Sequence, residues 1–275
     1  MSTEPRPLPP PAPAPARGTG SSSGPGPARG SGSTSGPGPA RGSGPGPATN
    51  PSAEPDGLAR TRRALHAVAE HVLAAARYRA TGRIGLAVTP GGFATPAFGP
   101  AGRTVAVAGT DLVVRDGDAE TARSPLTTLR EAAHLAGVEP GGPAAVYRLA
   151  TPCHPDEPLD IDPDAARLLA DWFALGAAAL RRWSVEIAAD APSPPTLWPE
   201  HFDLAIRAGQ INYGLSPGDE AFAAPYAYVG PPLPPPSLPT GFWNASFGAA
   251  RTWTDVGSVD AVVDLFRQAR RHAST

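Results

Sequence analysis

The chain contains no lysine, one methionine and one cysteine among its 275 residues. Because Cys153 has no second cysteine to pair with, an intrachain disulfide is excluded, and nothing indicates an oxidising compartment. No apolar run reaches the length of a membrane span, and the first residues lack the apolar core of a signal peptide. These absences favour a cytoplasmic protein that does not enter the membrane.

Residues 1–55 also lack the side chains that build a core, since Leu8 is their one leucine and they hold no aromatic residue. A twelve-residue unit, Pro-Ala-Arg-Gly followed by Thr or Ser and Gly, begins at Pro15, Pro27 and Pro39. A segment rich in Pro, Ala, Gly, Ser and Thr cannot bury enough apolar surface to offset the entropy lost on ordering. The sequence therefore predicts a long disordered tail, a spacer or a weak anion-binding arm, followed by a single domain over residues 56–275.

The net charge indicates whether the predicted domain is suited to bind nucleic acid. Four arginines against two glutamates leave the tail at +2, and the whole-chain charge of −2 then leaves −4 for the predicted domain. Nucleic-acid-binding domains normally carry a basic surface. We therefore expect no nucleic-acid partner.

Hydrophobic periodicity and turn residues predict an α+β fold, with a mainly antiparallel sheet flanked by helices. Helices are expected at 57–80, 125–136 (after Ser124 as cap), 163–183 and from 259 onward. Strands are expected at 84–88, 104–108, 112–115, 145–149, 202–206, 211–215, 226–229 and 243–247. Residues 231–239 form a proline-rich loop, which could dock a partner in the polyproline conformation.

Three short stretches carry a resemblance: Gly-Arg-Ile-Gly-Leu-Ala-Val-Thr-Pro at 82–90, Asp-Pro-Asp-Ala-Ala-Arg at 162–167 and Phe-Asp-Leu-Ala-Ile at 202–206. In this order the chain resembles, over about residues 65–215, a bacterial family of domains of unknown function common in actinobacteria. It departs from the family at 91–94, where a Trp- and His-containing segment is missing, and at 207–209, where an Arg-Phe-Ser-Gly-Arg run is missing. The resemblance implies a single α+β domain and carries no activity.

Chemically able side chains gather between residues 196 and 230. His201 lies between Glu200 and Asp203, and a carboxylate beside an imidazole is suited to general acid–base work. On a strand, His201 and Asp203 would share one face. The alternative is an exposed polar strand face, because nothing nearby supplies a nucleophile.

A second set is aromatic, amide and acidic, and could bind a small planar ligand or a partner. Its members are Trp198, Asn212, Tyr213, Asp219, Tyr226, Tyr228, Trp243 and Asn244. Alternation places Tyr226 and Tyr228 on one face of a strand, where they either form a binding surface or pack as core. On the first predicted helix, His66 and Glu70 are four residues apart. This spacing indicates a solvated helix face or an ordinary His–Glu pair.

No residue pattern predicts a metal or a cofactor, since Cys153 and His154 alone do not make a zinc site. The leading hypothesis is a non-catalytic domain that binds a small molecule or a partner through residues 197–230 and 242–247. The alternatives are a hydrolase-like enzyme with His201 as base, supported by Glu200, Asp203 or Asp219, and an interaction protein that uses the 231–239 loop. Whether the chain is an enzyme, and its oligomeric state, stay open at this point.

Overall fold

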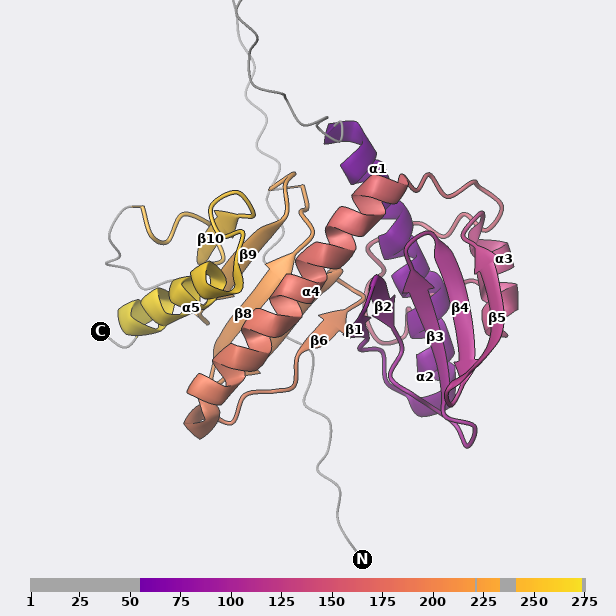
Figure 1. Ribbon diagram of the computed structural model, residues 1–275, viewed down its shortest axis with the longest axis horizontal. Coiled ribbons are helices and arrows are strands. Elements are labelled where there is room, and N and C mark those ends of the chain that lie inside the picture. Colours follow the sequence, from indigo (N-terminus) through magenta and orange to yellow (C-terminus); the bar gives the residue numbers. More distant parts are fainter. Residues whose placement is uncertain (1–54, 221, 233–240, 274–275) are drawn as a thin grey trace, which may run out of the picture. The chain divides into compact units, whose positions relative to one another are not determined.

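The computed structural model describes residues 55–220, 222–232 and 241–273. The predicted tail, apart from Pro55, and most of the proline-rich loop lie outside these residues. The described chain is an α+β fold with two five-stranded antiparallel sheets and flanking helices, which confirms the predicted fold class (Figure 1). None of the described helices is long and apolar enough to cross a membrane.

The first half of the fold is a helical segment, a meander sheet and a short helix. The helical segment runs through α1 (Pro55–Val68), a π-helical turn η1 (Ala69–Ala74) and α2 (Ala75–Thr81). The sheet has the order β1-β2-β3-β4-β5, formed by β1 (Ala87–Thr89), β2 (Gly92–Ala94), β3 (Arg103–Ala108), β4 (Asp111–Asp116) and β5 (Ala119–Pro125). Helix α3 (Leu129–Ala136) follows and packs against η1.

The second half repeats this plan. Helix α4 (Pro163–Glu186) and a 3-10 turn, η2 (Ala188–Asp190), precede the second sheet. That sheet has the order β10-β9-β8-β7-β6, formed by β6 (Thr196–Trp198), β7 (Asp203–Ala208), β8 (Ile211–Ser216), β9 (Tyr226–Gly230) and β10 (Ala249–Thr252). Helix α5 (Val259–Ala273) closes it and packs against α4 and β9. Each half is thus a helix, a five-stranded meander and a helix.

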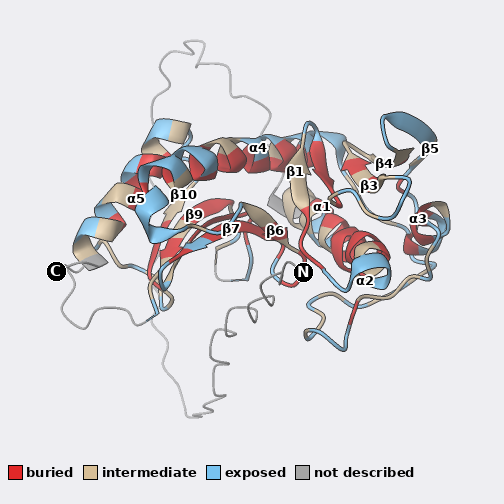
Figure 2. Cartoon of the chain, turned by 90° about the horizontal axis from the view of Figure 1, so that it is seen from below, coloured by how far each residue is buried: buried red, intermediate tan, exposed pale blue. Residues whose placement is uncertain are grey.

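The two sheets meet at their first strands. Leu86 and Leu197 exchange two backbone hydrogen bonds, with N···O distances of 2.8 and 3.0 Å, in an isolated antiparallel bridge. Helix α4 contacts β1 and β2 of one sheet and β7 and β8 of the other. Figure 2 shows buried positions where α4 faces the strands, and one hydrophobic cluster runs through both halves.

Several local sequence signals form the predicted elements. The Asp162 side chain caps α4 by accepting a hydrogen bond from the Ala165 amide at 2.8 Å, and Pro163 occupies the first turn. Gly82 ends the first helical segment with a φ of 70°. The hairpin predicted around Gly109 is confirmed as β3 and β4. Ser258 caps α5 through the Ala261 amide at 3.2 Å.

Other predictions are wrong in position or type. The chain does not enter a helix at Ser124, because β5 continues to Pro125 and Thr128 caps α3 instead, accepting from the Glu131 amide. Residues 145–147 form a turn and a bend, and 148–149 have no regular structure, so the predicted strand is absent there. Residues 243–247 form no strand beyond a single bridge at Ala245, and the true strand is β10. The strand expected at 84–88 is shorter and begins at Ala87.

Candidate functional site

Residues of the second sheet alternate between a face that packs on α4 and an opposite, outer face. Tyr228 pairs with Gly214 on one side and with Ala250 on the other, and Gly214 in turn pairs with Ala205. A Cβ built on Gly214 would lie 2.5 Å from Tyr228 Cζ, so the tyrosine ring rests directly on the glycine backbone. The small residues of this row therefore make a seat for one aromatic ring.

Four aromatic rings gather on this outer face: Phe222, Tyr226, Tyr228 and Phe247, hereafter the aromatic face. The Tyr226 and Tyr228 ring centroids are 6.1 Å apart, and Phe247 lies 6.2 Å from the first and 6.1 Å from the second. Phe222 lies 4.9 Å from Tyr226. Segments 197–230 and 242–247, which the sequence analysis grouped together, thus meet in space, and the two tyrosines share a face as predicted.

Both tyrosine hydroxyls of the aromatic face are held by carboxylates. Tyr226 Oη donates to Asp219 Oδ2 at 2.6 Å, and Tyr228 Oη donates to Asp203 Oδ2. Burial raises the pKa of Tyr226 and of Tyr228 well above the usual value, and the neighbouring carboxylates raise it further. Both phenols therefore stay protonated, and their orientation is fixed by hydrogen bonds.

The turn between β6 and β7 decides where the acidic residues point. Phe202 has a φ of 52°, a left-handed conformation that a bulky side chain adopts only at some cost. Its ring is 1% exposed and stacks on His66 with a centroid distance of 5.2 Å. The ring also makes edge contacts with Phe93 and Phe173, both at 5.4 Å. Packing of this ring into the core holds the turn in its strained conformation.

Because β7 begins only at Asp203, His201 is not a strand residue, and the predicted shared face of His201 and Asp203 is wrong. His201 is exposed, whereas Glu200 and Asp203 are each 8% exposed. No hydrogen bond joins the imidazole to either carboxylate among the described residues, and no hydroxyl or thiol there bonds to it. The three residues are neighbours, since His201 opposes the upward pKa shifts of both acids.

Glu200 and Asp203 are buried acids with unused oxygens. Within the described residues, both Glu200 oxygens and Asp203 Oδ1 lack a hydrogen-bond partner. Burial raises the pKa of both carboxyls above their usual values. The nearby carboxylates of Asp203 and Glu70 raise the pKa of Glu200 further. In the part of the chain that the structure describes, no group of His, Cys, Asp and Glu is placed to hold a metal ion.

A second polar cluster, which sequence reasoning missed, lies on the π-helical turn. Glu70 and His71 are fully buried, although the sequence placed Glu70 on an ordinary helix face. The Glu70 carboxylate accepts from the backbone amides of Ala150 and Thr151 at 3.0 and 2.8 Å, and from the Thr151 hydroxyl at 2.5 Å. His66 Nε2 lies 3.9 Å from Glu70 Oε2, but it hydrogen-bonds to the Pro199 carbonyl at 2.7 Å, and burial lowers the pKa of His66. The widened turn carries no local sequence signal, so burial of Glu70 could not be foreseen.

The Tyr147 hydroxyl adjoins this cluster. The Tyr147 hydroxyl oxygen is buried and makes no hydrogen bond of good geometry in the described chain. Burial raises the pKa of Tyr147 most, and the nearby carboxylates of Glu70 and Glu200 raise it further. Glu200 is also close enough to Glu70 and to Asp203 for both of them to raise its pKa.

Of the remaining predicted ligand residues, Asn212 shares the outer side of the second sheet, because it lies two positions before Gly214 in β8, whereas Tyr213 does not. Tyr213 is in the core on the opposite side of the sheet, 5.4 Å from Trp183 and 5.3 Å from Phe266, and burial raises its pKa to about 12. Trp243 packs on Phe242 at 5.1 Å. Asn244 is exposed, and its side chain accepts a hydrogen bond from the Ala250 amide at 2.9 Å. Trp198 and Asn212 are half-buried.

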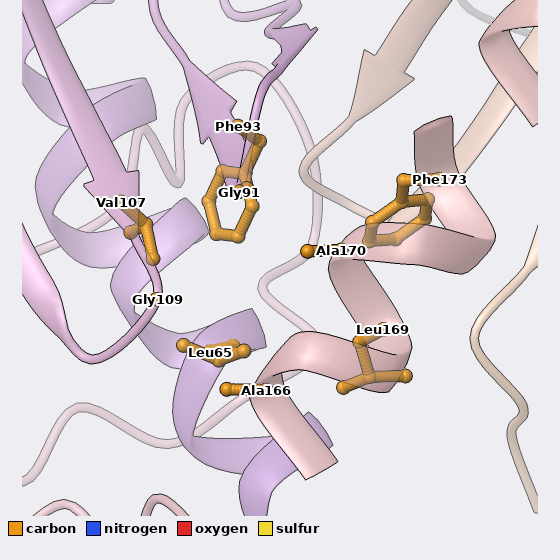
Figure 3. Close-up of a pocket in the computed structure, with 10 residues that line it drawn as sticks. Leu65, Gly91, Phe93, Val107, Gly109, Ala166, Leu169, Ala170 and Phe173 are labelled. Atoms are coloured by element: carbon orange, nitrogen blue, oxygen red, sulfur yellow. The ribbon is translucent and has the colours of Figure 1, made fainter. Parts of the chain in front are cut away.

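Two cavities of the described chain lie elsewhere. One, between the first helix, the first sheet and α4, is apolar and holds about 10 Å³, lined by side chains such as Leu65, Phe93 and Phe173 (Figure 3). Another holds about 190 Å³ beside Tyr78, Arg79 and Glu139. Neither is lined by a residue of the aromatic face or of the β6–β7 turn.

Comparison with known proteins returns no relatives. No family model matches the chain, no curated protein matches it, and no solved structure matches the fold. The resemblance to the actinobacterial family therefore stays an expectation drawn from three short motifs.

Proposed function

We propose that the chain is a non-catalytic cytoplasmic domain that binds a protein partner through the aromatic face. The observation that carries this proposal is the gathering of Phe222, Tyr226, Tyr228 and Phe247 on the side of the second sheet away from α4. Tyrosine combines a large apolar surface with a polar tip, which makes it effective in protein interfaces. Because each hydroxyl donates to a carboxylate, each ring is already oriented before a partner arrives.

A protein partner fits this face better than a small molecule. Small ligands usually bind in concave sites that bury most of their surface. Two cavities of the described chain, beside Leu65 and beside Tyr78, are not lined by a residue of the aromatic face. In the aromatic face Tyr226 is 5% exposed and the other three rings are half-buried, and the edges that these three rings present to solvent are suited to contact over a broad area. The net negative charge of residues 56–275 agrees with a partner other than nucleic acid.

The test compares two matched variants of the full chain. Phe247→Ser removes a ring that contacts three others of the aromatic face, and Val185→Asp changes a residue that is 78% exposed on α4. Each immobilised protein is exposed to lysate and cross-linked, and the bound proteins are quantified by mass spectrometry. We expect a specific protein to be lost with Phe247→Ser and retained with Val185→Asp. An identical bound set for all three proteins contradicts the proposal.

A second candidate is a hydrolase with His201 as general base. It is favoured by the two buried acids beside His201, whose pKa values are raised, because perturbed acids cluster at catalytic sites. The lack of a hydroxyl or thiol bonded to His201 among the described residues leaves only water as a nucleophile. Hydrolysis of simple esters that disappears in His201→Ala and persists in His154→Ala, another exposed histidine, would support this candidate over the first.

A further inference from the structure

A cavity of about 190 Å³ is lined by helix α2 on one side and by the segment that follows α3 on the other. Helix α2 contributes Tyr78 and Arg79, and the segment contributes Glu139. One water molecule takes up about 30 Å³ of the liquid, so the cavity has room for about six. Drug-sized ligands usually need about 300–1,000 Å³. The volume therefore suits an organic molecule that is larger than a simple ion and smaller than a drug-sized compound.

The buried His71 fixes one wall of this cavity. Its Nδ1 accepts a hydrogen bond from the Gly142 amide at 3.0 Å, and its carbonyl accepts one from the Gly141 amide at 3.1 Å. On the other side of the ring, Nε2–H donates to the Thr151 carbonyl at 3.1 Å. Burial lowers the pKa of His71, so the ring stays neutral and Nδ1 stays an acceptor. A wall held in this way is already in place before a ligand arrives.

Two opposite charges line the cavity without pairing with each other. Arg79 and Glu139 are exposed, and neither side chain forms a hydrogen bond or an ion pair with another of the described residues. Elsewhere in the described chain an exposed arginine pairs with a carboxylate close to it, as Arg130 does with Asp156 at 2.6 Å. A ligand that carries both charges can bridge the two unpaired side chains.

Arg130 does not occupy the Glu139 carboxylate. Asp156 raises the pKa of Arg130 most, and the nearby Glu139 raises it further. The Arg130 Nε and Nη2 atoms, however, donate to the two Asp156 carboxylate oxygens at 2.6 and 2.8 Å, so the guanidinium is already engaged in a bidentate pair. The Glu139 oxygens therefore remain available to a ligand in the cavity.

Apolar side chains complete the lining, from Ala75, Tyr78, Val138 and Pro143. A guanidinium, a carboxylate and an apolar surface around one small space match the three parts of an α-amino acid, which are its carboxylate, its ammonium group and its side chain. A phosphate would be repelled by Glu139, and a simple amine would be repelled by Arg79. We propose that this cavity binds a free α-amino acid with an apolar side chain.

In this site Arg79 donates to the α-carboxylate, Glu139 accepts from the α-ammonium group, and the ligand side chain packs on Tyr78 and Val138. Because exposed ion pairs contribute little free energy, we expect a Kd in roughly the millimolar range. None of the residues that line the cavity belongs to the aromatic face. The amino-acid site therefore stands or fails separately from the proposed partner binding.

The first test is an NMR titration of the unmutated full chain at constant ionic strength. The probes are L-leucine and two analogues that each keep one of its charges, 3-methylbutylamine and 4-methylpentanoate. L-Leucine should shift the backbone amide signals of Glu139, Gly141 and Gly142. Each analogue should bind at least about fivefold more weakly, since it lacks one charged contact. Amide signals that do not move with L-leucine, or an analogue that binds as tightly as L-leucine, overturn the proposal.

Two variants test each charged contact separately. In Arg79→Gln, L-leucine should bind no more tightly than 3-methylbutylamine, because the carboxylate has lost its partner. In Glu139→Gln, L-leucine should bind no more tightly than 4-methylpentanoate, because the ammonium group has lost its partner. The controls Arg181→Gln and Glu157→Gln change exposed residues outside the cavity and should leave the Kd for L-leucine unchanged. If the two variants weaken all three probes alike, they act only through the structure, and the proposal is refuted.

Discussion

Glu200 offers the sharpest test of the polar network at the β6–β7 turn. The perturbation is Glu200→Gln, which keeps the shape of the side chain and removes its charge. In the described chain neither Glu200 oxygen has a hydrogen-bond partner, and the residue is 8% exposed. A carboxylate in this position costs stability, because its ionised form loses solvation and receives no hydrogen bonds in return.

The expected magnitude follows from that burial. An unsatisfied buried polar group costs roughly 1–3 kcal/mol, and a charged one more, but the glutamine amide is itself unpartnered and cancels part of the gain. We therefore expect Glu200→Gln to raise the free energy of unfolding by about 1–2 kcal/mol at pH 8. Most substitutions of buried polar residues lower stability, so a gain would be diagnostic.

The pH dependence has a definite sign. The pKa of Glu200 is raised in the folded protein above its usual value of 4.5, so the native state retains a proton that the unfolded chain has already released. The free energy of unfolding of the wild type should therefore fall as the pH rises from 4.5 through the folded-state pKa. Below that window Glu200 is protonated in both states, and the advantage of Glu200→Gln should disappear.

Urea denaturation followed by circular dichroism at several pH values measures this difference. Glu157→Gln serves as the control, because its side chain is 72% exposed and the substitution should change stability by less than about 0.5 kcal/mol. If Glu200→Gln is less stable than the wild type at pH 8, the reasoning fails. The carboxylate would then be satisfied by a bound water, ion or chain segment, and the turn would be a stabilising polar network.

Three further substitutions test the packing. Gly214→Ala should lower stability by about 1–3 kcal/mol and displace Tyr228, because the new Cβ would lie 2.5 Å from the ring. Ala191→Gly should raise stability by about 0.5–1 kcal/mol, because Ala191 has a φ of 48°, where glycine is unstrained. Thr61→Val should lower the free energy of unfolding by about 1–3 kcal/mol, because the hydroxyl of the fully buried Thr61 accepts a hydrogen bond from the Asp162 amide at 2.8 Å.

Each of these has a matched control, with thermal and urea unfolding as the readout. Gly57→Ala adds a Cβ with nothing within 4 Å and should be neutral or stabilising. Ala188→Gly, at an ordinary helical position beside Ala191, should lower stability rather than raise it. Thr61→Ser keeps the hydroxyl and should retain most of the hydrogen bond. Loss of stability in Ala191→Gly, or none in Thr61→Val or Gly214→Ala, would contradict the respective prediction.

Features set within a few residues were readable from the sequence. The Asp162-Pro163 cap of α4, the Gly82 helix end and the Gly109 hairpin each depend on groups close together along the chain. The shared face of Tyr226 and Tyr228 follows from the two-residue period of any strand. The α+β class follows from the sum of such local signals.

Which face of a sheet is covered, and by what, depends on residues far apart in the chain, and only the tertiary structure decided it. Tyr213 looked equivalent to Tyr228 in the sequence, yet it packs in the core while Tyr228 lies on the outer face. The position of Glu200 depends on the Phe202 ring, which is held by side chains from three other elements. A local pattern specifies alternation along a strand, but long-range packing determines which side of it faces the core.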